Sequence, residues 1–71
     1  MNQRDRDAIE FALWWIDLDG NKENRRKTLA IQIRNRGRNR SVAVQSAMYT
    51  AADLIEAGDI EGAIETLEDL S

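Results

Sequence analysis

Basic side chains in the middle of the chain are the residues best suited to chemistry. Residues 22–40 contain eight basic side chains and one acidic side chain, Glu23. An arginine guanidinium binds a phosphate through two parallel hydrogen bonds, and asparagine binds phosphates or base edges. This composition favours salt-dependent binding to the phosphates of DNA or RNA. The candidate nucleic-acid-binding residues are Arg25, Arg26, Lys27, Arg34, Arg36, Arg38 and Arg40.

The acidic end of the chain offers a different use for these arginines. Residues 41–71 carry seven acidic side chains and no basic one, whereas residues 1–21 carry five acidic and two basic ones. Helices of opposite charge that pack side by side neutralise each other, within one chain or between two chains. An acidic protein partner is a further alternative. The net charge of −3 and the lack of an aromatic residue among the arginines both favour a protein partner over a nucleic acid.

Aromatic side chains form the second group that could bind a partner. Trp14 and Trp15 are adjacent, so on a helix they point about 100° apart and cannot both face one core. We expect one of them to pack in the core with Phe11 and Leu18 nearby, and the other to be exposed. An exposed tryptophan is either an interface hot spot or a side chain of no consequence. The candidate protein-interface residues are Phe11, Trp14, Trp15, Leu18 and Tyr49.

Catalytic chemistry is not expected from this sequence. The chain has no His and no Cys, and both lysines, Lys22 and Lys27, lie among arginines. A catalytic nucleophile needs an adjacent base that takes its proton, most often a histidine. A glycine-rich phosphate-binding loop is also missing. We therefore expect a non-enzymatic protein without a cofactor and without a small-molecule substrate.

Residues 17–21, Asp-Leu-Asp-Gly-Asn, partly match the start of a calcium-binding loop. Such a loop needs glycine at its sixth position and a bidentate glutamate at its twelfth. The chain has Lys22 and Thr28 there, and strongly basic residues follow. We interpret the segment as a turn that ends a helix, and we predict no metal site.

Glycines and capping residues divide the chain into four predicted helices. The expected helices cover residues 5–18, 23–36, 41–57 and 60–70, separated by turns at Gly20, Gly37 and Gly58. Residues 28–34 alternate loosely enough to form a short strand, but a single strand would have no partner, so we favour helix. Seventy-one residues support one domain, residues 1–71. The predicted fold class is an all-α bundle of three or four helices that ends in a helical hairpin.

The first predicted helix is apolar almost all round, with only a narrow polar strip. Such a helix is normally buried on several sides, so it is central or it meets another chain. A homodimer or a subunit of a hetero-complex follows from this pattern. No run of residues is apolar enough to span a membrane, and the N-terminus does not have the order of a signal peptide. We expect a cytoplasmic protein that does not bind membranes.

Within the last two predicted helices, the stretch from Ala47 to Leu70 resembles one tetratricopeptide-type repeat. The resemblance rests on residues 54–65, Leu-Ile-Glu-Ala-Gly-Asp-Ile-Glu-Gly-Ala-Ile-Glu, with the small residue Ala63 where the family's two helices approach each other. Ala47 and Ala51 stand where the family has aromatic and glycine residues. The resemblance implies a helical hairpin and no function, since such arrays need about three or more repeats to form a binding groove.

The leading functional hypothesis is a small protein-interaction module. It would act as an adaptor, inhibitor or regulator that docks on another protein, and it would self-associate. The alternative is a nucleic-acid-binding regulator that uses the arginine-rich segment 22–40.

Overall fold

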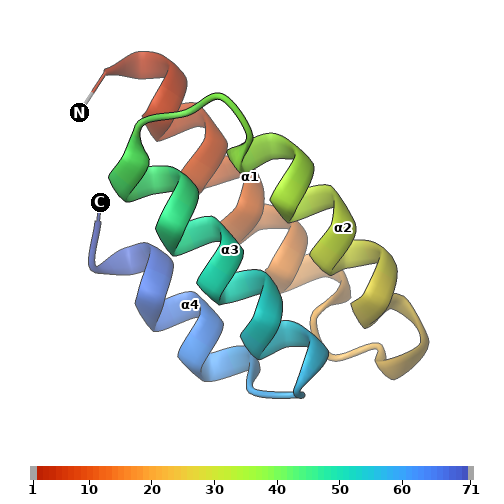
Figure 1. Ribbon diagram of the computed structural model, residues 1–71. Helices are drawn as coiled ribbons and strands as arrows, with labels where there is room; N and C mark the ends of the chain where they lie inside the picture. Colours follow the sequence, from red (N-terminus) through yellow and green to blue (C-terminus); the bar gives the residue numbers. More distant parts are fainter. Residues whose placement is uncertain (1, 71) are drawn as a thin grey trace.

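The computed structural model describes residues 2–70, and within this range the chain is helical without any strand. Four α-helices and one turn of 3-10 helix follow one another (Figure 1). They are α1 (Gln3–Asp19), η1 (Glu23–Arg25), α2 (Arg26–Gly37), α3 (Val42–Glu56) and α4 (Ile60–Glu68). This confirms the predicted all-α bundle of three or four helices, and it confirms helix in preference to strand for residues 28–34.

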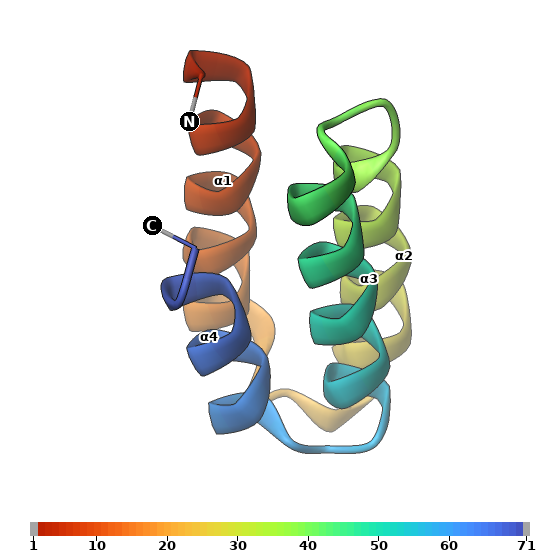
Figure 2. The same cartoon turned by 60° about the vertical axis from the view of Figure 1, so that its left-hand side comes forward.

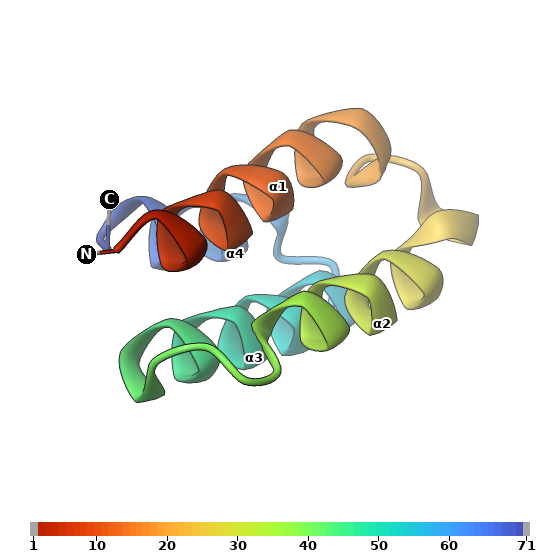
Figure 3. The same ribbon diagram turned by 90° about the horizontal axis from the view of Figure 1, so that it is seen from above.

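The four helices form two layers. Helices α1 and α4 lie on one side of the bundle, and α2 and α3 lie on the other, as the views in Figures 2 and 3 agree. The chain thus ends in the predicted α3–α4 hairpin. Within residues 2–70, no helix is long and apolar enough to cross a membrane.

All four helices contribute to one core. Ile16 of α1, Ile33 of α2, Ile55 of α3 and Leu67 of α4 are almost completely buried. Each of these side chains lies on the apolar face of its helix. Full burial of one such side chain stabilises the fold by about 1.5–3 kcal/mol. Only one side of α1 enters this core, so α1 is not central in the bundle, and the alternative that it meets another chain stays a prediction.

Gly37 was predicted to form the turn between the second and third helices, and this prediction is wrong. Gly37 is the buried last residue of α2, and a Cβ atom at this position would lie 3.0 Å from the Cβ atom of Met48 on α3. Its lack of a side chain therefore permits the close approach of α2 and α3. The turn begins one residue later, and Asn39 in this turn adopts a positive φ of 67°, which asparagine tolerates better than most residues.

The helix ends follow from short polar residues. Gly58 has a φ of 89° just after α3, and the Asp59 carboxylate accepts a hydrogen bond of 2.9 Å from the backbone N–H of Gly62. Both roles were predicted from the sequence. The carboxylate of Asp5 is buried near the start of α1, where its Oδ1 accepts a 3.4 Å hydrogen bond from the backbone N–H of Ser41. That contact ties the start of α1 to the α2–α3 turn.

Candidate functional site

Four of the five predicted protein-interface residues lie together on the outer side of α1. We call this set the α1 stripe; it consists of Phe11, Trp14, Trp15 and Leu18. Trp14 is 60% exposed and Leu18 is 52% exposed, whereas Phe11 and Trp15 are half-buried. Exposed apolar side chains that occur singly are common on protein surfaces, whereas large contiguous apolar patches are typical of interaction sites.

The two tryptophans take different roles, as their angular separation predicted. Trp15 packs against the core, and its indole N–H donates a 2.9 Å hydrogen bond to the Asp19 carboxylate. This bond holds the pKa of Asp19 below its ordinary value, and Lys22, which forms a 3.4 Å ion pair with Asp19, acts in the same direction. Leu18 was expected to pack beside the buried tryptophan, but half of its surface faces solvent. Trp14 and Leu18 are therefore the largest apolar side chains that α1 exposes to solvent.

Phe11 connects the aromatic group to the arginine-rich segment. Its ring meets the Trp15 ring edge-on, with the ring centroids 5.1 Å apart, and the guanidinium of Arg36 lies 3.9 Å above the Phe11 ring centroid. A guanidinium over an aromatic face is an attractive cation–π contact. The sequence showed no aromatic residue among the arginines, and the fold supplies one from α1.

The α1 stripe has flanks of opposite charge. On a helix with about 100° per residue, Glu10 and Asp17 lie on the side of Trp14 that is remote from Trp15. The other side faces α2, which contributes Arg36 above Phe11. Arg25, just before α2, is exposed and attracts the Asp19 carboxylate. The apolar stripe thus separates a carboxylate flank (Glu10 and Asp17) from a guanidinium flank (Arg25 and Arg36).

Arg34 forms ion pairs with two carboxylates of the same chain. Its guanidinium reaches from α2 to α3, where it lies 2.6 Å from the Asp53 carboxylate and also pairs with Glu56. The hydrogen bond to Glu56, followed by the one to Asp53, raises the pKa of Arg34 above its ordinary value. Among residues 2–70, the ion pairs of the seven predicted nucleic-acid-binding residues all belong to Arg34. Pairing with the acidic helices therefore accounts for this arginine and leaves the other six basic residues to be explained.

Arg26 lies at the end of the bundle that holds the turn after α1 and the α3–α4 turn. Its Nε donates a 3.2 Å hydrogen bond to the carbonyl oxygen of Gly20, in the turn after α1. A Cβ atom built on Gly58, in the α3–α4 turn, would lie 3.4 Å from the guanidinium of Arg26. The Arg26 side chain therefore bonds to the turn after α1 and lies beside the α3–α4 turn.

The remaining basic residues do not form one surface. Lys27 and Arg25 are exposed at the start of α2, and Arg38 is exposed beyond its end. Arg40 is half-buried, and its Nε is enclosed without a hydrogen-bond partner within residues 2–70. The arginine-rich segment is continuous in the sequence, but α2 places its two halves at opposite ends of a helix.

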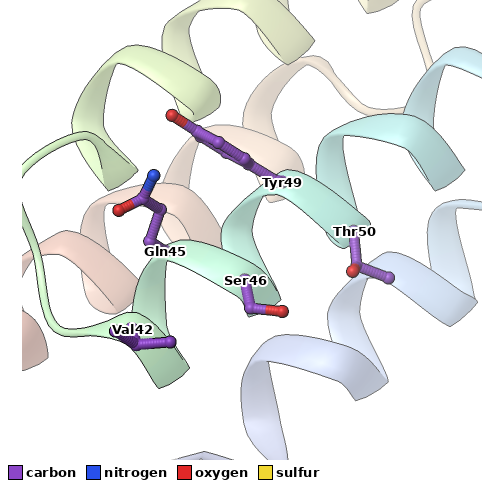
Figure 4. Close-up of a pocket in the computed structure, with 5 residues that line it drawn as sticks. All are labelled: Val42, Gln45, Ser46, Tyr49 and Thr50. Atoms are coloured by element: carbon purple, nitrogen blue, oxygen red, sulfur yellow. The ribbon is translucent and has the colours of Figure 1, made fainter.

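Tyr49, the fifth predicted interface residue, lies on α3 and not with the α1 stripe. It lines a shallow hollow on the outer side of α3 (Figure 4). The other residues of this hollow are Val42, Gln45, Ser46 and Thr50. Figure 4 shows Tyr49 and Gln45 extending to one side of α3, and Ser46 and Thr50 extending to the other. Val42 is 86% exposed and gives this second surface an apolar edge.

Comparison of the chain with known protein families, with curated proteins and with solved structures finds no match. The likeness of the α3–α4 hairpin to a tetratricopeptide-type repeat therefore remains a local resemblance. Ala63 is completely buried in this hairpin, at the position where the resemblance implied a small residue.

Proposed function

We propose that this protein is a small, non-enzymatic interaction module that docks on another protein through the α1 stripe. It acts as an adaptor, inhibitor or regulator, and we expect it to do so in the cytoplasm. The observation that carries the proposal is the exposure of Trp14 and Leu18 on one line of α1, 60% and 52% respectively. Trp is the residue type most enriched among interface hot spots, because it buries a large apolar area at a low entropic cost.

The surroundings of the stripe support the same proposal. Arg36 is held over Phe11, and the ring of Phe11 contacts that of Trp15, so this side of the surface is preorganised. A preorganised surface loses less side-chain entropy when it binds. A central apolar patch with a charged rim is also the usual composition of a protein–protein interface.

The proposal is tested by photo-cross-linking in the cell. A photoreactive amino acid replaces Trp14 in one variant and Ile31 in a matched control, since Ile31 is an apolar α2 side chain that is 47% exposed. We expect a cross-linked protein from position 14 and none from position 31. Equal yields from both positions, or none from position 14, would contradict a binding role of the α1 stripe.

Nucleic-acid binding is the second candidate function, and two observations favour it. Of the seven predicted residues, only Arg34 forms an ion pair within residues 2–70. The guanidinium of Arg36 lies over the Phe11 ring, and arginine makes the same kind of cation–π contact with the bases of single-stranded nucleic acids. The test is the anisotropy of labelled duplex and single-stranded oligonucleotides at low and moderate salt. Binding through phosphates predicts that the double variant Arg36→Gln/Arg38→Gln lowers the salt slope by about one per lost contact. An unchanged slope would remove both residues from this function.

A further inference from the structure

We infer that the protein covering the α1 stripe is a second copy of this chain, with the two α1 helices side by side and parallel about a two-fold axis along them. This inference rests on the proposed function, because it names the occupant of the same surface. It specifies the orientation of the two copies from the distribution of charge beside the stripe.

The spacing of the stripe is that of a short two-stranded coiled coil. Phe11, Trp14 and Leu18 are separated by three and then four residues, which is the a–d–a spacing of a heptad. In this register Glu10 and Asp17 occupy the g positions, and Trp15 occupies the e position. Residues at e and g flank the apolar seam and set the orientation of the partner through their charges.

The guanidinium flank supplies the charges that residues at the e positions supply in an ordinary coiled coil. Trp15 at the e position is half-buried, and the charges on this side come from α2 and its start: Arg36 above the Phe11 ring, and Arg25 near Asp19. Between residues 10 and 18, α1 itself carries carboxylates and no basic side chain. One flank of the seam is therefore negative and the other is positive.

This division of charge selects one of the two symmetric arrangements. A two-fold axis parallel to α1 brings the g flank of each copy against the e flank of the other, so that Glu10 meets Arg36 and Asp17 meets Arg25. The heights agree, because Arg36 lies over Phe11, the neighbour of Glu10, and Arg25 belongs to η1, which follows the turn after the last residue of α1, Asp19. An axis perpendicular to α1 would bring the carboxylate flanks together, where like charges repel. In the parallel pair, opposite charges meet along both flanks of the stripe between residues 10 and 18.

Single cysteines test the orientation directly, because the chain has no Cys of its own. In the parallel pair each Leu18 meets its own copy, so Leu18→Cys alone gives a covalent dimer with a short bismaleimide. Ile31→Cys is the matched control, since its exposure of 47% is close to the 52% of Leu18. A cross-link that forms only when Phe11→Cys and Leu18→Cys variants are mixed would show an antiparallel pair and overturn the inference.

Charge reversal gives an independent test by sedimentation equilibrium. Glu10→Arg and Arg36→Glu should each weaken the dimer about tenfold, because an attraction becomes a repulsion at two symmetric places. The combined variant restores affinity, whereas the control pair Glu65→Arg and Arg38→Glu, away from the stripe, leaves it unchanged. Tighter association of Glu10→Arg would indicate the antiparallel pair and overturn the inference.

The failure of the inference and that of the proposed function are distinguishable. A monomer at every concentration would overturn the two-fold pair. If position 14 nevertheless cross-links to a different protein in the cell, the proposed function stands. If neither self-association nor a cross-link is found, both fail.

Discussion

The α2–α3 contact and the outer side of α1 are both apolar helix surfaces, and the chain covers only the first. At the α2–α3 contact, Met48 and Ile33 are completely buried, and Gly37 allows the two backbones to approach closely. On α1, more than half of the surface of Trp14 and of Leu18 faces solvent. Under the proposed function, one apolar surface stabilises the fold and the other binds a partner, so substitutions should separate stability from binding.

The largest effect is expected at the covered surface. Met48→Ala leaves a cavity between α2 and α3 and should lower the free energy of unfolding by about 2–5 kcal/mol, as measured by chemical denaturation. Val42→Ala on the same helix is the control, because Val42 is 86% exposed and should change stability by at most about 0.5 kcal/mol. Similar values for the two variants would mean that the α2–α3 contact is not the tightly packed part of the fold.

An intermediate effect is expected at the polar edge of the same surface. Arg34→Ala removes the contacts with Asp53 and Glu56 and should cost about 1 kcal/mol of stability, less at high salt. Arg38→Ala is the control, since Arg38 is exposed and forms no ion pair with another of residues 2–70. Equal losses from both variants would contradict a stabilising role of the Arg34 contacts.

A smaller effect, at acid pH, is expected where the α1 stripe meets the core. The Trp15 N–H bond lowers the pKa of Asp19 in the folded state, so its stabilising effect is present above the ordinary pKa of 3.8 and is lost as the pH falls through the lowered value. Asp19→Asn should flatten the stability profile in this acid range, as followed by tryptophan fluorescence during urea unfolding. Glu65→Gln, an exposed position on α4, should leave the profile unchanged. The same flattening in both variants would exclude the Asp19 bond as its cause.

The smallest effect on stability is expected at the uncovered surface. At concentrations where the chain is monomeric, Trp14→Ala and Leu18→Ala should each change the free energy of unfolding by about 0.5 kcal/mol or less, because their side chains are largely solvated in the native state. Urea denaturation of the dilute protein measures this. A loss of stability as large as that of Met48→Ala would mean that Trp14 and Leu18 belong to the core and that α1 has no separate uncovered surface.

The elements of the fold were predictable where local chemistry fixes them. Helices α3 and α4 begin at Ser41 and Asp59, which cap the free backbone N–H groups, and Gly58 ends α3 with a positive φ. Gly37 was assigned to a turn because a glycine near a helix end has the same sequence signal whether it bends the chain or admits a neighbouring helix. Only the position of Met48 on another helix distinguishes the two cases.

The candidate site was predictable in its residue types and not in its assembly. The angular separation of Trp14 and Trp15 is a local property, and it predicted that the two would differ in exposure. The contact between Arg36 and Phe11 joins residues that are far apart in the sequence, and it depends on the packing of α2 against α1. The separation of Tyr49 from the α1 stripe likewise depends on the layers of the bundle, which the sequence pattern does not specify.

Pairing of the α1 stripe with a second copy of this chain is measured by the light-scattering mass of the unmodified chain over a range of concentrations, alone and with oligonucleotides. We predict a mass that rises toward that of the dimer and changes little with salt or added nucleic acid. The Trp14→Ala/Leu18→Ala variant should stay monomeric. A monomer that takes up oligonucleotides at low salt and releases them as salt rises would contradict this pairing and would move the functional site to the arginine-rich segment.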